Sequence, residues 1–180
     1  MVCVLALAVS QSRAGEEHGP KKPQPGPEMA RLKCMLGTWT GTAEIISPAP
    51  EGGDEAQTAF KGQSTSEWAL GGMYLKSEGW HEMGGGQKMH YVEYVTWDAE
   101  AGKYHGWYFS NWGEAGESWM TVSDDGKTWS YYGKSKDAEG NPTKGKGTVT
   151  FIDEDTMEWT WTEKGSEGEM HLKGTSKRTS

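Results

Sequence analysis

The sequence predicts an all-β fold, an up-and-down antiparallel barrel of about ten strands preceded by one short helix. From Leu36 onward, segments that alternate polar and apolar residues recur about every dozen residues. Ten tryptophans and seven tyrosines are concentrated in these segments, as is typical of half-buried strands. Turn residues separate the segments, so consecutive hairpins predict a meander that closes on itself.

Residues 1–14 are predicted to be a signal peptide. The run Met1–Ser10 is apolar but too short to cross a bilayer. Ser12 and Ala14 supply the small residues that a cleavage site requires. No Lys or Arg precedes the apolar run, and a hydrophobic N-terminal strand or helix is the alternative. We therefore expect an exported protein, secreted or periplasmic.

A tether and then a helix precede the barrel. Residues 15–27 hold four of the seven prolines and read as an extended tether, which leaves 28–180 as the barrel domain. Apolar residues at three-residue spacing over Glu28–Met35 predict a short amphipathic helix that covers one end of the barrel. These residues are Met29, Leu32 and Met35.

Ten strands are predicted after this helix, with turn residues between them. The Asp125-Gly126 pair between Val122 and Trp129 is a strong hairpin signal. The expected strands are Leu36–Ser47, Thr58–Ala69, Met73–Met83, Lys88–Trp97, Lys103–Asn111, Glu117–Ser123, Thr128–Lys136, Gly147–Ile152, Thr156–Glu163 and Glu169–Arg178.

Alternation predicts which way three of the strands face. Met157, Trp159 and Trp161 share the inward face of their strand. Trp39 in the first strand and Arg178 in the last also fall on inward faces. The strands at 88–97 and 103–111 carry large rings on both faces, so the pattern leaves their inward side open.

The opening of the first strand, Leu36-Gly37-Thr38-Trp39-Thr40-Gly41, resembles the Gly-x-Trp signature of the calycin superfamily, which includes the lipocalins. The wider pattern resembles a bacterial calycin-like family of secreted proteins of unknown function, and Trp97 departs from it where Tyr is usual. The resemblance implies a lipocalin-like barrel and carries over no catalytic residue. It rests on Leu70–Leu75, Thr96-Trp97-Asp98, Gly102-Lys103-Tyr104, Trp107, the Gly126 hairpin and Lys177-Arg178, within Met29 to Arg178.

The resemblance also implies a barrel-closing pair. In calycins the Gly-x-Trp indole stacks against a basic side chain of the last strand. Trp39 and Arg178 match these positions, and their strands must meet in a closed meander. We expect their side chains to touch, with the cation within about 6 Å of the ring centroid.

We expect the barrel interior to bind a small apolar or aromatic molecule without catalysing a reaction, because concave sites are mostly apolar with a few oriented polar groups. The alternative is a structural or protein-interaction module whose rings fill the barrel. A cavity of several hundred Å³ would favour the binding protein. The candidate wall residues are Trp68, Trp107, Met120, Tyr131, Trp159 and Trp161.

Two other chemistries are weaker interpretations. His81, Glu82 and His90 lie near one hairpin but lack the spacing of a zinc site, so no metal is expected. His90, Glu93 and His105 would form an acid–base set only if all faced inward. His90 and Glu93 are an odd number of residues apart and should face opposite ways, which disfavours a lipocalin-fold enzyme.

A haem-binding barrel is a further alternative. The run Thr38–Gly41 resembles the opening of the nitrobindins, but Ala43-Glu44-Ile45 departs from their continuation. A histidine of the last strand would be the axial ligand, and His171 is predicted to face outward. No cofactor is therefore expected.

The charge limits the partners. The net charge of −8 disfavours nucleic acid and anionic membrane surfaces. No segment of the mature chain reads as a membrane span, and Cys34, the one cysteine left after cleavage, is expected to be a small buried side chain. The oligomeric state stays open.

Overall fold

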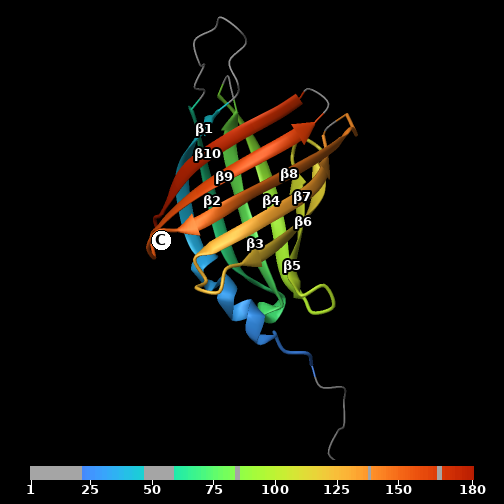
Figure 1. Ribbon diagram of the computed structural model, residues 1–180, viewed down its shortest axis with the longest axis vertical. Helices are drawn as coiled ribbons and strands as arrows, with labels where there is room; N and C mark the ends of the chain where they lie inside the picture. The colour runs from blue at the N-terminus through green and yellow to red at the C-terminus, as the bar shows by residue number, and fades with distance from the viewer. Residues whose placement is uncertain (1–21, 47–58, 84–85, 138, 166–167) are drawn as a thin grey trace, which may run out of the picture.

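The computed structural model describes residues 22–46, 59–83, 86–137, 139–165 and 168–180. The predicted signal peptide and the first part of the tether lie outside these residues. Ten antiparallel strands form one closed barrel, each paired with its neighbours in chain order, and β1 pairs with β10 (Figure 1). The predicted fold class is confirmed, including the pairing of the two terminal strands.

The strands agree with the expected ranges within a few residues except for β8, which begins at Pro142 and not at Gly147. Its first half is Pro, Lys and Gly, which have low β-propensity, yet it pairs with β7 from Lys136↔Pro142 onward. The strands are β1 (Gly37–Ile45), β2 (Ala59–Ala69), β3 (Tyr74–Met83), β4 (Gln87–Asp98), β5 (Lys103–Ser110), β6 (Ala115–Val122), β7 (Thr128–Lys136), β8 (Pro142–Phe151), β9 (Thr156–Gly165) and β10 (Gly168–Arg178).

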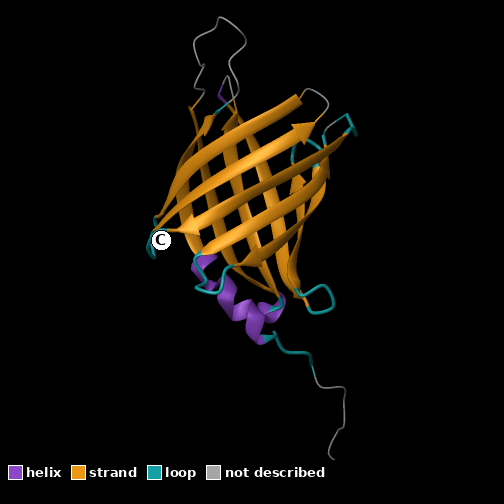
Figure 2. Cartoon of the chain, viewed as in Figure 1, coloured by secondary structure: helices purple, strands orange, loops and turns teal. Residues whose placement is uncertain are grey.

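The expected helix is present as a 3-10 helix, η1 (Pro27–Met35), and it lies across one end of the barrel (Figure 2). A second, three-residue turn, η2 (Leu70–Gly72), joins β2 to β3. A 3-10 helix has three residues per turn, so apolar residues three apart in η1 share one face. Met29 and Leu32 on this face are buried in the barrel core. We call this end of the barrel the η1 end and the opposite end the distal end.

Strand pairing settles the two strands whose inward side the pattern left open. Val95 of β4 and Tyr104 of β5 are buried in the core. Glu93 lies two residues from Val95 and opposite Tyr108, so both also face inward. Trp107 directly precedes Tyr108 and therefore faces the outside of the barrel. There it lies opposite Tyr94 of β4 and Glu117 of β6.

Trp39 and Arg178 meet at the η1 end. The guanidinium carbon of Arg178 lies 4.3 Å from the Trp39 ring centroid. Arg178 also donates hydrogen bonds to the backbone carbonyls of Leu36, Cys34 and Glu154. The indole of Trp39 donates to the carbonyl of Met35 at 3.1 Å. Through these contacts one arginine joins η1, both terminal strands and the turn before β9.

Candidate functional site: the barrel interior

The half of the interior nearest η1 is solid. Seven of its inward side chains are at most 8% exposed and form one cluster with Met29 and Leu32 of η1. Trp97, Tyr104 and Trp129 pack ring against ring, with centroids 4.9 and 5.1 Å apart. No ligand fits here without displacing core. The cluster comprises Trp39, Leu75, Val95, Tyr104, Met120, Trp129 and Phe151.

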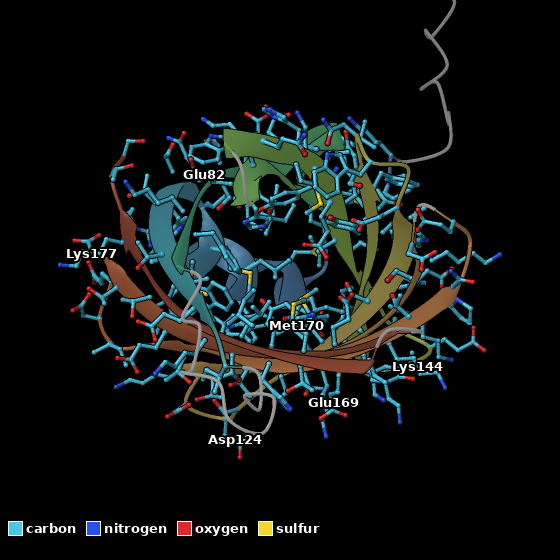
Figure 3. All side chains as sticks on the ribbon, turned by 90° about the horizontal axis from the view of Figure 1, so that it is seen from above. Glu82, Asp124, Lys144, Glu169, Met170 and Lys177 are labelled. Atoms are coloured by element: carbon cyan, nitrogen blue, oxygen red, sulfur yellow. The ribbon has the colours of Figure 1, made fainter. Side chains whose placement is uncertain are left out.

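The distal half is lined by inward side chains that keep accessible surface. Tyr91, Glu93, Trp159 and Trp161 are only partly buried, although the strand register directs them inward. Because the sheet covers them from outside, this surface faces the barrel interior. Figure 3 looks into this half from the distal end, with η1 at the far end.

Glycines shape one wall of the distal half, on β8–β10. A methyl group at Gly174 would overlap the Trp159 indole, and one at Gly145 would overlap the Trp161 indole. The missing side chains therefore let both indoles lie along the wall instead of across the interior. Their N–H groups donate at 3.3 Å to Ser176 Oγ and Glu163 Oε2 respectively.

The facing wall, on β2–β6, is polar. The His81 ring stacks on Tyr91, with centroids 5.0 Å apart and planes 10° apart, and Tyr91 stacks on Tyr108 at 5.8 Å. Ser118 donates a hydrogen bond of 3.0 Å to Glu93. The interior thus presents indoles on one side and hydrogen-bonding groups on the other.

Burial favours the uncharged form of the groups on this polar wall. It raises the pKa of the Glu93 carboxyl, which the Ser118 hydrogen bond partly opposes. Burial and the nearby Glu93 raise the pKa of Tyr91 to about 12. Burial lowers the pKa of His81. Hydrogen-bonding groups shifted in this direction suit an uncharged ligand better than an ion.

A cavity of about 150 Å³ lies between the two walls. It is smaller than the several hundred Å³ expected and below the roughly 300–1,000 Å³ of drug-sized sites. An engineered protein cavity of about 150 Å³ binds benzene, so this volume fits a single ring. The lining residues are Trp39, Gly41, Thr42, Ala43, Phe60, Gly62, Gln63, Ser64, His81, Tyr91, Met157, Trp159 and Ser176.

A larger hollow of about 540 Å³ lies on the outer surface of β1 and β8–β10. Threonine, glutamate and lysine side chains that point away from the interior line most of it, among them Thr148, Thr160 and Lys173. It is open to solvent and has few apolar side chains, so the smaller interior cavity is the better ligand site.

The structure separates the six candidate wall residues. Trp159 borders the cavity. Trp161 and Tyr131 face the interior without bordering it. Met120 is part of the solid core and Trp68 packs against it.

The prediction that Trp107 lines the interior was wrong, because Trp107 lies on the outer face of the barrel. Its strand neighbours Tyr94 and Glu117 are also on that face, and its ring contacts Tyr74 and His105. A ring of this size on a strand with aromatic residues on both faces gave no directional signal.

Sequence reasoning missed Phe60, Ser64, His81 and Tyr91 as lining residues. A signal for part of this set exists in β2, where small residues occupy alternate positions, as Gly62 and Ser64 do. Small inward residues leave space in a barrel, and this pattern could have been read as a cavity wall.

The histidines are divided between the two faces. His81 faces inward, whereas His90 follows Met89 and faces outward, as do Glu82 and His105. Glu93 faces inward, so His90 and Glu93 lie on opposite faces as the alternation predicts. No group of three His, Cys, Asp or Glu suited to a metal ion occurs among the described residues.

Two further residues lie away from the cavity. His171 is on the outer face of β10, 3.1 Å from Glu169. Cys34 packs against the core at the η1 end, where burial raises the pKa of its thiol.

In the part of the chain that the structure describes, no helix has the length and apolar character to cross a membrane.

The fold and this interior define the class of the protein, a closed ten-stranded antiparallel up-and-down barrel. The chain belongs to the family described as "Protein of unknown function (DUF1579)", which matches residues 24–176. No curated protein matches the chain.

Solved structures share the fold at low identity. The crystal structure of Rv2717c from M. tuberculosis is similar over 87% of this chain and 100% of that chain, with a TM-score of 0.64 and 14% identity. The S-type phycobiliprotein lyase CPES from Guillardia theta is similar over 85% of this chain and 91% of that chain, with a TM-score of 0.53 and 10% identity. At these identities the similarity concerns the fold alone.

Proposed function

We propose that this protein binds a small, uncharged aromatic molecule of about one ring in the distal half of its barrel, without catalysing a reaction on it. The cavity of about 150 Å³ between an indole wall and a polar wall is the observation that carries the proposal. A single ring matches this volume.

The lining groups give the ligand its chemistry. The Trp159 indole and the Phe60 ring supply aromatic surface for stacking. Ser64, His81 and Tyr91 supply hydroxyl and imidazole groups on the same cavity. A ring that carries one hydroxyl or similar polar group uses both walls, whereas an aliphatic molecule uses neither stacking nor hydrogen bonding.

A structural or protein-interaction module is the second candidate, supported by the solid half at the η1 end. In that case the cavity would be a packing defect and would bind one-ring molecules no better than any apolar hole. Preference for a polar ring over a bare one separates the two functions.

The test measures the binding of three probes, phenol, benzene and cyclohexane. Binding is detected by tryptophan fluorescence and by native mass spectrometry. The variant Ser64→Leu places a larger side chain in the cavity, and Thr65→Leu on the same strand places it on the outer face. We expect phenol to bind most tightly, and Ser64→Leu to weaken it by about tenfold because the added atoms occupy its space. Absence of binding by all three probes, or equal loss in both variants, would contradict the proposal.

We further propose that the protein is exported, on the basis of residues 1–14. The intact mass of the protein recovered outside the cytoplasm of its host tests this. Recovery there without the first 14 residues supports export by this segment, whereas recovery in the cytoplasm alone contradicts it.

A further inference from the structure

Two adjacent rows of outward side chains cross the barrel wall from β5 to β9. In the first row, strand pairing sets Trp107 opposite Glu117, and then Lys134, Lys144 and Lys164 follow in succession. The second row lies two residues along each strand. We call the ten residues of the two rows the lysine–aromatic platform: Trp107, Glu117, Lys134, Lys144, Lys164, His105, Trp119, Tyr132, Lys146 and Thr162.

The aromatic part of the platform is continuous. The His105 ring lies 4.2 Å from Trp107 and 5.2 Å from Trp119, and Trp119 lies 6.1 Å from Tyr132. Lys134 Nζ lies 5.8 Å from the Trp119 centroid and 6.0 Å from that of Tyr132. A contiguous apolar patch on a protein surface can mark a binding site.

The lysine part places like charges side by side. Lys134, Lys144 and Lys164 are directly opposite one another on three neighbouring strands, an arrangement that destabilises a sheet. Among the described residues, no ion pair joins these lysines to a carboxylate. Figure 3 shows Lys144 on the outside of the barrel. Glu117 and Glu169 lie opposite Lys134 and Lys164 at the two ends of the row, and Lys146 adds a fourth lysine beside it. In a chain of net charge −8, this local excess of positive charge indicates an anionic partner.

We propose that the platform binds an acidic polysaccharide, with its chain lying across strands β5 to β9. Neighbouring strands are about 4.8 Å apart, so the lysine row repeats its charge at about the length of one sugar residue. Successive sugars of a β-1,4-linked chain face opposite ways, so carboxylates on alternate sugars, about two strand spacings apart, pair with Lys134 and Lys164. The C–H face of a further sugar contacts the Tyr132 ring, which is 42% exposed.

Two other polyanions fit the platform less well. Single-stranded nucleic acid stacks its bases on free aromatic faces, but His105 lies between Trp107 and Trp119 and uses their faces. An anionic membrane surface is bound through apolar side chains that project into it. Trp107 and Trp119 are only partly exposed, and Tyr132, at 42%, is the most exposed of these rings.

The experiment measures binding of the full chain to a hexamer of β-1,4-linked mannuronate by isothermal titration calorimetry. Cellohexaose, which has the same linkage and no charge, is the matched sugar. We expect the mannuronate hexamer to bind saturably and to weaken as salt is raised, and cellohexaose to bind at least about tenfold more weakly because it lacks the ion pairs.

Two pairs of variants locate the site. Lys134→Gln/Lys144→Gln/Lys164→Gln should weaken binding of the hexamer about tenfold or more. Lys33→Gln/Lys61→Gln/Lys177→Gln, on exposed lysines of η1, β2 and β10, should change it less than about twofold. Trp119→Ala should weaken it, whereas Trp80→Ala, another outward tryptophan, should not. The platform triple variant should also melt at a higher temperature than the control triple variant, because it removes the like-charge row.

Failure of the hexamer to bind, or equal loss in both triple variants, would overturn the proposal. So would binding of a twelve-residue oligothymidylate or of phosphatidylglycerol vesicles at equal or higher affinity. Because the platform and the cavity are on opposite faces of the sheet, phenol binding in the triple variant should match that of the unaltered chain.

Discussion

The two halves of the barrel interior are built from the same ten strands and are filled differently. At the η1 end, Tyr104 and Trp129 project into the centre and are at most 1% exposed. In the distal half, Trp159 and Trp161 are the same kind of side chain but lie along a wall of glycines. The positions of the glycines, and not the number of strands, therefore decide which part of this barrel is filled by side chains.

The halves also differ in chemistry. The η1 half is apolar and is closed by a helix, whereas the distal half carries Glu93, His81 and Tyr91 on its inner surface. Buried polar groups without full pairing reduce stability. The stability of this fold should therefore reside at the η1 end, which leaves the distal half free to carry a function.

Removing one large ring from each half should give the largest difference in the free energy of unfolding between the two halves. Trp129→Ala should lower the free energy of unfolding by about 3–5 kcal/mol, because Trp129 is fully buried and a cavity would remain. Trp161→Ala should cost clearly less, because its side chain is only partly buried. Urea unfolding of both variants measures this, and equal losses would show that the halves are packed alike.

The contact between the helix and the terminal strands should rank next. Arg178→Met removes the charged donor of the Leu36, Cys34 and Glu154 carbonyls and should cost about 2–3 kcal/mol. Lys177→Met, on the neighbouring outward position, should change stability by less than about 0.5 kcal/mol. Differential scanning calorimetry compares them, and a small loss for Arg178→Met would show that closure of the η1 end does not depend on this side chain.

A pair of facing glycines tests whether the distal wall needs a residue without a side chain beneath the Trp161 indole. Gly145→Ala should cost about 1–3 kcal/mol, because the new methyl group overlaps the Trp161 indole. Gly133, directly opposite on β7, has only ordinary contacts with the same indole, so Gly133→Ala should change stability by much less. Thermal unfolding monitored by tryptophan fluorescence tests this. Similar losses in the two variants would contradict the indole–glycine arrangement.

The smallest expected effect concerns pH. Burial raises the pKa of Glu93 in the folded state above its unfolded value of 4.5. Its contribution to stability is therefore fully present below about pH 4.5 and is lost as the pH rises through the folded pKa. Glu93→Gln does not titrate, so its stability relative to the unaltered chain should increase across that range.

Urea unfolding of both proteins at a series of pH values measures the difference. The lowered pKa of His81 acts in the opposite direction, with stability lost as the pH falls below 6.5. It is common to both proteins and cancels in the comparison. A pH-independent difference would show that the Glu93 carboxyl is not desolvated by the barrel.

Prediction from the sequence succeeded where each residue carries its own signal. Period-2 alternation located the strands, and Met157, Trp159 and Trp161 follow it with one face apolar. The turn at Asp125-Gly126 needs a positive φ, which Gly126 adopts at 77°. The apolar spacing of η1 predicted the helix and its buried face, although its 3-10 geometry emerged only from the structure.

Prediction failed where direction depends on partners. Trp107 has large rings on both sides along its strand, and only its pairing with Tyr94 and Glu117 shows that it faces out. Likewise, the lysine row exists only because three strands align Lys134, Lys144 and Lys164, which are ten and twenty residues apart in the chain.

The sequence by itself determined the number of strands, their order and the residues that lie on each side of the clearest ones, because side-chain alternation and turn chemistry are local. Tertiary structure decided the register between strands. Register places Gly145 under Trp161 and Tyr91 beside His81, and so sets which part of the interior is filled. No local pattern encodes it, because it depends on how far each strand is shifted against its neighbour when the barrel closes.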